Sequence, residues 1–229
     1  MPYLRSIGSA KVKRIILIIL FLVSLALGWQ GYRLYRKVLA PGVFLGQPSE
    51  ICFVQDSTRA DSLWTDLERR GWIRDRHILE ILASRKGMVG MVRPGRYRLR
   101  DGMSLNALVN MFRGGLQEPL QLVIRPFRSM DELLGYLDAQ LQADRMSLQL
   151  ALGNDSLLHG AGLASATRLL MLVPNTYEVW WTTSAQAFAA RMQKEYLSFW
   201  NEGRRQRAEA LGLSPSRVGI LASIVQEET

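Results

Sequence analysis

The sequence predicts an α+β protein with an N-terminal transmembrane helix. Three observations indicate this class: an uncharged apolar run near the N-terminus, a first region in which strand, helix, helix and strand follow one another, and a second region that mixes short strands with longer helices. Apolar residues make up 48% of the chain, which is ample for a hydrophobic core. We therefore expect a basic tail, a membrane helix and two folded regions, over residues 1–14, 15–35, 45–115 and 116–229.

The apolar run from Ile15 to Gly28 has the composition of a membrane helix but is short for one. Its fourteen residues span about 21 Å as a helix, whereas the hydrocarbon core is about 30 Å thick. Trp29, Tyr32 and Tyr35 extend the run with aromatic residues of the kind found at membrane interfaces. The alternative is a cleaved signal peptide with Ala26-Leu27-Gly28 as its small-residue site. The aromatic extension favours an uncleaved single-pass anchor.

The net charge of +9 belongs mainly to the membrane-flanking end of the chain. Residues 1–37 hold seven of the 29 basic residues and no acidic one, so the remaining 22 basic residues face 20 acidic ones. This nearly neutral body argues against nucleic acid as a partner. Basic residues lie on both sides of the apolar run: Lys11, Lys13 and Arg14 before it, and Arg33, Arg36 and Lys37 after it. The group before the run favours a cytoplasmic N-terminus, with the folded regions outside the cytoplasm.

Cysteine and histidine give no sign of a disulfide or a metal site. The single cysteine, Cys52, excludes an intrachain disulfide, and it lies in the apolar run 51–54, where we expect a buried strand residue and not a reactive thiol. His77 and His159 lie far apart, and neither has a neighbour at metal-ligand spacing. We therefore expect no metal and no cofactor.

The first folded region is expected to contain two strands with two helices between them, followed by a third helix. Apolar spacing and turn residues predict the first four elements at residues 51–54, 61–71, 76–84 and 96–100. The third helix begins after the capping residue Ser104 and ends at Gly114-Gly115.

The second of these strands alternates arginine with apolar residues. Arg96, Arg98 and Arg100 therefore share one face, which either contacts an anionic lipid or polymer or is simply solvated. The unit of two short helices between two strands resembles a LysM-like module, and the run PGRYRLRDGMS matches best. Such modules recognise N-acetylated glycans, so the resemblance implies a glycan-binding role.

The second folded region opens with a predicted strand at residues 120–124. A capping-box pattern at residues 129–132 then begins a helix. A Gly-rich connection leads to the apolar run 169–173, which we expect to be a buried strand. Thr183 is expected to cap one long helix that continues to Gly212.

The stretch from Ser214 to Thr229 predicts a helix that ends in acidic residues. Ser214 can cap the free N–H groups, and Pro215 occupies the first turn. Apolar residues on several faces predict that the helix is buried most of the way round. A carboxyl held away from water, such as Glu228 or its neighbour Glu227, would have a raised pKa and could donate a proton near neutral pH. The alternative is an ordinary solvated helix end.

The segment PNTYEVWW, residues 174–181, is a candidate sugar site. Its aromatic rings have flat faces suited to sugars, and its amide and hydroxyl groups can bond to sugar hydroxyl or acetamido groups. We take Asn175, Tyr177 and Trp180 as the candidate substrate-binding residues, with Thr176 and Trp181 beside them. The alternative for each aromatic residue is that it packs on the long helix that follows.

A membrane anchor, a LysM-like module, LVPNTYEVWW and LASIVQEET together resemble the endolytic murein transglycosylases (MltG/YceG-like). The resemblance covers nearly everything after the anchor, and the last two motifs are specific. It implies that Glu228, the glutamate before the threonine, is the catalytic residue. The family often has a second acid two places earlier, where this chain has Gln226, and Glu227 is a minor rival.

The resemblance implies a lytic reaction on peptidoglycan. One glutamic acid protonates the glycosidic oxygen between N-acetylmuramic acid and N-acetylglucosamine, and its conjugate base takes the proton of the muramyl 6-hydroxyl, so that a 1,6-anhydro ring closes without water. Ordinary glycosidases use two carboxylates, but this route works with one. The implied location is the bacterial inner membrane, with the main domain in the periplasm. The implied partners are glycan strands and cell-wall synthases.

Members of the family continue beyond the glutamate motif, whereas this chain stops one residue after Glu228. We therefore expect residues 116–229 to form only the N-terminal part of the catalytic domain, with a solvated glutamate and little or no activity from this chain alone. A zymogram against purified murein with this chain and an extended one decides the question. Two alternatives stay open: a non-catalytic, membrane-tethered peptidoglycan-binding adaptor, and a scaffold for cell-wall synthases held through the anchor helix.

Overall fold

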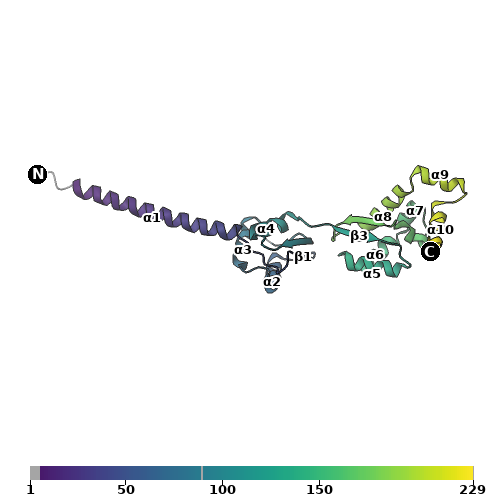
Figure 1. Cartoon of the computed structure of the whole chain (residues 1–229), viewed down its shortest axis with the longest axis horizontal. Coiled ribbons are helices and arrows are strands. Elements are labelled where there is room, and N and C mark those ends of the chain that lie inside the picture. The colour runs from purple at the N-terminus through teal and green to yellow at the C-terminus, as the bar shows by residue number, and fades with distance from the viewer. Residues whose placement is uncertain (1–5, 89, 229) are drawn as a thin grey trace. The chain divides into compact units, whose positions relative to one another are not determined.

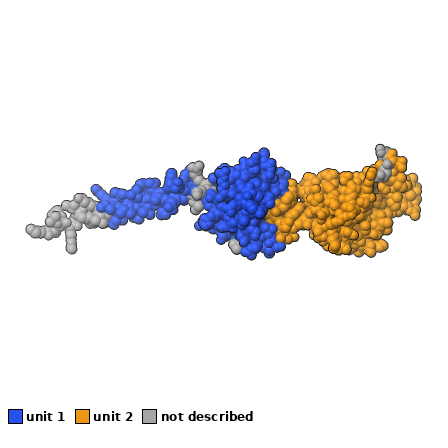
Figure 2. All heavy atoms as spheres, turned by 90° about the horizontal axis from the view of Figure 1, so that it is seen from below, with its two compact units in different colours: residues 1–52, 57–93, 98–116 blue, residues 53–56, 94–97, 117–229 orange. Residues whose placement is uncertain are grey.

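The protein forms two compact units in the computed structural model, which describes residues 6–88 and 90–228. Unit 1 comprises residues 1–52, 57–93 and 98–116, and unit 2 comprises residues 53–56, 94–97 and 117–229. Figure 1 labels the helices and strands, and Figure 2 colours the two units. Helices and small two-stranded sheets are combined along the chain, which confirms the predicted α+β class.

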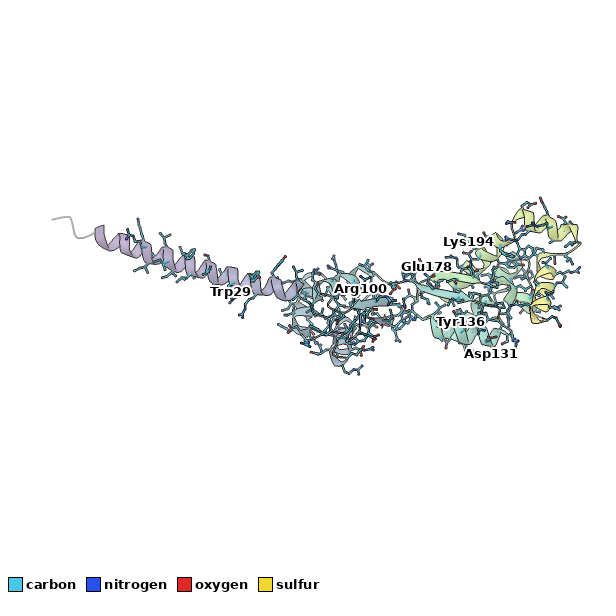
Figure 3. The ribbon with its side chains drawn as sticks, in the orientation of Figure 1. Trp29, Arg100, Asp131, Tyr136, Glu178 and Lys194 are labelled. Atoms are coloured by element: carbon cyan, nitrogen blue, oxygen red, sulfur yellow. The ribbon has the colours of Figure 1, made fainter. Side chains whose placement is uncertain are left out.

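The N-terminal helix α1, Ser6–Leu39, contains one segment that is long and apolar enough to cross a membrane. This segment is Lys13–Arg33, with a mean hydropathy of 2.1, and it includes most of the predicted span 15–35. Its apolar side chains are exposed, as Trp29 is in Figure 3. The helix fits a single-pass membrane protein, and a signal sequence near an N-terminus has the same features.

Residues 49–114 contain the predicted order of strand, helix, helix, strand and helix. The elements are β1 (Ser49–Val54), α2 (Ala60–Arg69), α3 (Arg76–Arg85), β2 (Gly95–Arg100) and α4 (Leu105–Gly114). The two strands pair with each other in a two-stranded sheet. Helix α4 begins as predicted, because Ser104 Oγ accepts a hydrogen bond of 3.2 Å from Ala107 N. It ends at Gly115, whose φ of 65° lies in the left-handed region that favours glycine.

The core of unit 1 is formed by the apolar faces of its helices. Trp64 of α2 and Phe112 of α4 are both fully buried, and their ring centroids lie 5.8 Å apart. Helix α3 packs against both α2 and α4. Cys52 is buried, as predicted, and burial raises the pKa of its thiol to about 11. Cys52 is therefore a small core residue, and its thiol is not a nucleophile.

Unit 2 is built on a two-stranded antiparallel sheet and a set of helices. Its elements are β3 (Leu120–Ile124), α5 (Met130–Gln140), α6 (Arg145–Leu152), α7 (Asp155–Gly160), the 3-10 helix η1 (Ser165–Met171), β4 (Asn175–Val179), α8 (Ala185–Phe199), α9 (Glu202–Ala210) and α10 (Pro215–Glu227). Strands β3 and β4 pair over their whole length, with Leu122 opposite Tyr177.

One face of this sheet belongs to the core of unit 2. The inward residues of β3 and β4 join apolar residues of α5, α6 and α8 in a single hydrophobic cluster. Figure 3 labels Tyr136 of α5, whose hydroxyl accepts a hydrogen bond of 3.2 Å from Val123 N at the outer edge of β3. The outward residues of the two strands remain in contact with solvent, so the sheet separates a core face from a solvent face.

Three predictions for unit 2 are wrong. The apolar run 169–173 is not a strand, because η1 occupies most of it. The long helix predicted from Thr183 to Gly212 begins after Ser184 and is divided at Trp200, where Asn201 caps α9 by accepting a hydrogen bond of 3.1 Å from Arg204 N. The Gly-rich connection contains two helices, α6 and α7, that the sequence analysis did not predict. Short capped helices of this kind give weak periodic signals.

The difference between core and surface aromatic residues on α8 gives a test of the fold. We expect Phe188→Ala to lower the free energy of unfolding of unit 2 by about 3–5 kcal/mol, because Phe188 is fully buried. Phe199→Ala on the same helix is the matched control, since Phe199 is 38% exposed, and it should cost less than about 1 kcal/mol. Chemical denaturation of the full chain in detergent measures both. Equal losses would contradict the placement of the core.

Candidate active site

Helix α10 carries the candidate acid, and it begins as the sequence predicts. Ser214 Oγ accepts a hydrogen bond of 3.3 Å from Arg217 N, and Pro215 is the first helical residue. The predicted start of the helix is therefore confirmed.

The prediction that α10 is buried most of the way round is wrong. The helix packs on η1, where Gly219 lies so close to Leu170 that a β-carbon would be 3.1 Å from its methyl groups. Val218 is partly buried against the core of unit 2. The rest of the helix surface is open to solvent, and its large apolar residues are 40–64% exposed, namely Ile220, Leu221, Ile224 and Val225. One narrow contact strip therefore holds a helix that is apolar on several faces.

Glu228 lies at the C-terminal end of α10 and is solvated. Its backbone N–H donates to the carbonyl oxygen of Val225 at 3.3 Å, and its side chain is exposed. Its carboxylate makes no hydrogen bond or ion pair with any other residue that the structure describes. In this chain, Glu228 thus lies in the environment of an ordinary helix end and not in a dry pocket.

Tyr177 is a core residue of unit 2. Its side chain is 4% exposed, and its hydroxyl donates a hydrogen bond of 2.7 Å to the carbonyl oxygen of Val173. Burial raises the pKa of the hydroxyl above its ordinary value. Its ring therefore has no free face for a sugar. For Tyr177, the alternative in which the aromatic ring packs inside the protein applies.

Asn175 and Trp180 are accessible at the two ends of β4. The Asn175 carboxamide oxygen accepts a hydrogen bond of 2.8 Å from Thr176 N, and its side chain is exposed. Trp180 is 48% exposed, so part of its ring can stack on a ligand. Trp181 is half-buried, with its ring centroid 5.0 Å from that of Phe53. Of the candidate substrate-binding residues, Asn175 and Trp180 can reach a ligand from solvent, and Tyr177 cannot.

The solvent face of the sheet contains a polar pair that the sequence analysis missed. Gln121 of β3 lies opposite Glu178 of β4, and its amide nitrogen donates to the Glu178 carboxylate at 3.1 Å. Glu178 points to the same face as Thr176 and Trp180 because strand residues alternate between faces. The alternation of polar and apolar residues in TYEVW could have predicted which side chains face solvent. That prediction requires knowing first that the segment is a strand.

The arginines of β2 do not form one free basic face. Arg96 lies 3.6 Å from the Glu118 carboxylate and donates to the carbonyl oxygen of Pro119 at 3.4 Å. Arg98 donates to Ser49 Oγ at 3.2 Å. Arg100 is exposed. Two of the three side chains therefore have partners within the protein, and neither alternative of the sequence analysis describes the whole row.

The chemistry available in unit 2 is that of exposed carboxylic acids, Glu228 among them, and of the accessible side chains of Asn175 and Trp180. Within residues 6–88 and 90–228, no three His, Cys, Asp or Glu side chains gather as a metal site requires. Helix α10 packs on η1, and η1 leads through three residues into β4. The candidate acid and β4 thus belong to one folded unit.

Fold and site together define an α+β protein with a candidate membrane helix, an acid at the end of a helix and an exposed tryptophan at the end of a small sheet. The model of the YceG-like family matches residues 52–229, more than three quarters of the chain. The chain therefore belongs to the YceG-like family, the family of endolytic murein transglycosylases that its motifs resemble.

Two further comparisons add little to this assignment. A search of curated proteins finds no match. The crystal structure of a YceG-like protein from Listeria monocytogenes aligns with a TM-score of 0.40 and 17% sequence identity over 73% of this chain. The present chain spans 60% of the length of that protein.

The buried tyrosines of unit 2 predict a loss of stability at alkaline pH. Burial raises the pKa of Tyr177 and Tyr196 above the ordinary value near 10, so the folded state keeps these protons at a pH where the unfolded chain has lost them. The stabilisation is complete below about pH 10 and is lost as pH rises through the folded-state pKa values. Alkaline unfolding should therefore be shallower in the double variant Tyr177→Phe/Tyr196→Phe, measured by denaturation of the full chain between pH 8 and pH 12.

The control for this prediction is Tyr35→Phe, because Tyr35 is exposed on α1. It should leave the pH dependence unchanged. An unchanged pH dependence in the double variant would contradict the burial of the two hydroxyls.

Proposed function

We propose that this protein is a peptidoglycan lytic transglycosylase that cleaves the bond between N-acetylmuramic acid and N-acetylglucosamine within nascent glycan strands and leaves 1,6-anhydro ends. The observation that carries this proposal is the LASIVQEET motif on α10, in a chain that belongs to the YceG-like family. We assign Glu228 as the general acid and base. Its place at the end of a helix leaves the carboxyl within reach of a bound polymer.

The reaction needs one carboxyl group in two protonation states. Protonated Glu228 gives its proton to the glycosidic oxygen as the bond from C1 breaks. The resulting carboxylate takes the proton of the muramyl 6-hydroxyl, whose oxygen forms the new bond to C1. The proton count is balanced at the end of the cycle, and no water is consumed. One acid is therefore sufficient, in contrast to the carboxylate pair of ordinary glycosidases.

The accessible residues of β4 are proposed to hold the glycan strand. The exposed Trp180 ring offers a stacking surface for a sugar, and the Asn175 carboxamide can donate to a hydroxyl or acetamido oxygen. Tyr177 is proposed to act indirectly, because its hydroxyl fixes the carbonyl of Val173 just before β4 begins. Tyr177 is therefore a positioning residue for strand β4, and it does not contact sugar.

The candidate membrane helix supports the proposed location. Basic residues before the span favour a cytoplasmic N-terminus, with the two units in the periplasm beside the inner membrane. Nascent glycan strands are made at this surface. Cell-wall synthases are the protein partners that such a location implies.

The solvated state of Glu228 has a consequence for activity. General acid catalysis needs a carboxyl whose charged form is disfavoured, and water around a carboxylate favours the charged form. We therefore expect low activity from the 229-residue chain alone, since α10 exposes its apolar faces around the acid. A covering of that surface would exclude water from the acid and disfavour its charged form.

The same exposure favours one alternative function. A non-catalytic adaptor tethered to the membrane would need the strands and helices of unit 1 and the surface of β4, but not a dry acid. In that case the protein binds peptidoglycan and leaves its glycosidic bonds intact.

Glu228→Gln separates the two functions. In an enzyme, this variant should lower the formation of anhydro-muropeptides from purified murein by about 10²-fold or more, the usual contribution of general acid and base catalysis, while murein binding is retained. Glu227→Gln, with the same change of charge one residue away, is the matched control and should retain activity within a fewfold. The products are measured by chromatography and mass spectrometry, for the 229-residue chain and for one extended past Thr229.

The outcomes are distinct. Loss of product on Glu228→Gln alone supports the enzyme. Equal activity of the parent and the Glu228→Gln variant, or binding of murein without anhydro products in either length of chain, supports the adaptor.

A further inference from the structure

The solvent face of the β3–β4 sheet carries side chains that the proposed function does not yet use. Exposed and buried residues alternate along both strands, because one face of the sheet belongs to the core of unit 2. The strand residues on the solvent face are Gln121, Val123, Thr176 and Glu178. Trp180 directly follows β4 in the same alternation and is also exposed. This face is therefore a surface of mixed polar and apolar character.

The carboxylate of Glu178, labelled in Figure 3, is held in place across the sheet. Gln121 lies opposite Glu178 in the register of the two strands, and its amide nitrogen donates to Glu178 Oε2 at 3.1 Å. Within the described part of the chain, Glu178 Oε1 has no hydrogen-bond partner. One oxygen of the carboxylate is thus bound to the neighbouring strand, and the other is an acceptor available from solvent.

Exposed apolar side chains lie on both sides of this acceptor. Val123 is 51% exposed, and its place two residues from Gln121 on β3 makes it a diagonal neighbour of Glu178. Trp180, which is 48% exposed, lies two residues from Glu178 in the opposite direction, so their α-carbons are at most about 7 Å apart. The order along the face is therefore isopropyl group, carboxylate and indole ring.

An N-acetylated sugar has groups that match this order. Its acetamido N–H is a donor for a carboxylate oxygen, its acetamido methyl group is apolar, and its ring has a flat face that can stack on an indole. Diagonal neighbours on one face of a sheet lie about 7–8 Å apart, so one acetamido group can bond to Glu178 and contact Val123 together. A plain hydroxyl group in that position would leave Val123 without a contact. An anionic ligand is disfavoured by the charge of the carboxylate.

We propose that this face binds an N-acetylated sugar of a peptidoglycan strand, with Glu178 accepting the acetamido N–H, Val123 contacting the methyl group and Trp180 stacking on the ring. Gln121 is a positioning residue, because it acts on the sugar through the carboxylate that it holds. The choice of peptidoglycan rests on the proposed function. The selection of the acetamido group rests on Glu178 and Val123, and it adds specificity to the glycan contact.

The test is a titration of the full chain, in neutral detergent micelles, with two soluble β-1,4-linked oligosaccharides, followed by NMR or calorimetry. Tetra-N-acetylchitotetraose has an acetamido group on every sugar, and cellotetraose has a hydroxyl group in the same position. We expect the acetylated sugar to bind about tenfold more tightly, or better, because it bonds to a charged acceptor and also contacts an apolar group. Glu178→Ala should remove most of this preference, and Val123→Thr should reduce it.

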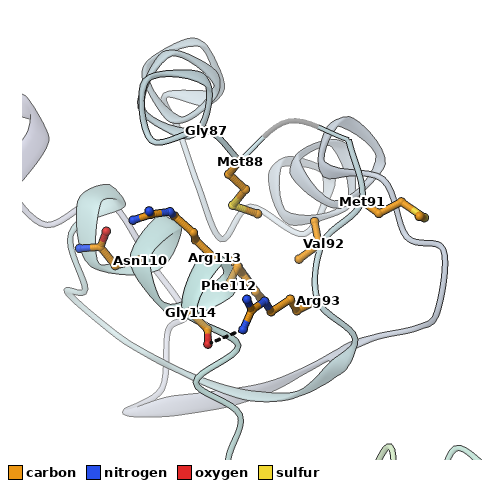
Figure 4. Close-up of a pocket in the computed structure, with 9 residues that line it drawn as sticks. All are labelled: Gly87, Met88, Met91, Val92, Arg93, Asn110, Phe112, Arg113 and Gly114. Carbon is orange, nitrogen blue, oxygen red and sulfur yellow. Dashed lines mark hydrogen bonds between the residues drawn. The ribbon is translucent and has the colours of Figure 1, made fainter.

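Glu209→Ala is the matched control, because Glu209 is an exposed glutamate of α9 and the change of charge is the same. This variant should bind the acetylated sugar within twofold of the parent. Arg113→Gln is a control for a different location. Arg113 lines a pocket of about 620 Å³ in unit 1, between the loop after α3 and the end of α4 (Figure 4). The affinity for the sugar should be unchanged in Arg113→Gln.

The role of Gln121 is tested by non-additivity. Gln121→Ala should lower the affinity for the acetylated sugar by a fewfold, because the Glu178 carboxylate is then free to rotate. In the Glu178→Ala background, the same change should have no further effect. Gln121 and Glu178 are both exposed, so the denaturation midpoint should stay at the parent value in all of these variants. This readout separates lost recognition from lost folding.

Four results would overturn the proposal: equal affinity for the two oligosaccharides, equal losses in Glu178→Ala and Glu209→Ala, loss of binding in Arg113→Gln, and additive effects of Gln121→Ala and Glu178→Ala. Glu228→Gln should leave the binding of both sugars unchanged, so the sugar site and the proposed catalysis can fail independently. A preference that depends on Glu178, in a protein that forms no anhydro-muropeptides, would support the sugar site and contradict only the lytic reaction.

Discussion

The pairing of β3 with β4 is the constraint on which the candidate site depends. It joins segments more than fifty residues apart, with Leu122 opposite Tyr177. Because successive strand residues point to opposite faces, the burial of Tyr177 and Val179 forces Glu178 and Trp180 into solvent. A shift of one residue would bury the Glu178 carboxylate and expose the core residues. The hydrophobic face that holds unit 2 together thus decides which side chains a ligand can reach.

Features with a local cause were predictable from the sequence, and features with a tertiary cause were not. Ser104, Gly115 and Ser214 define helix ends through their own backbone and side-chain bonds, so their roles are visible in the sequence. The strand at residues 120–124 follows from its composition. The burial of α10 depends instead on which neighbours cover it, and composition alone overestimated it. Likewise, the exposure of Trp180 and the burial of Tyr177 follow from alternation only after PNTYEVWW is known to contain a strand.

The exposure of α10 shows that the identity of an acidic residue and the solvation of its carboxyl group are separate requirements for acid catalysis. Glu228 is the residue that we propose as the acid, and the helix that carries it contacts η1 at Gly219. General acid catalysis at neutral pH also requires that the charged form be disfavoured, and water around a carboxylate stabilises the charged form. The four exposed apolar residues of α10 are the surface on which that water must be replaced. Under the proposed function, catalysis would therefore depend on covering this helix and not on adding a second acid.

The candidate membrane helix bears on how tightly the sheet of unit 2 would need to bind a glycan strand. A tethered surface meets a polymer at the same membrane at a raised effective concentration, which is about millimolar for short flexible connections. Under the proposed function, a weak contact from the exposed Trp180 ring would then be sufficient to hold the glycan strand.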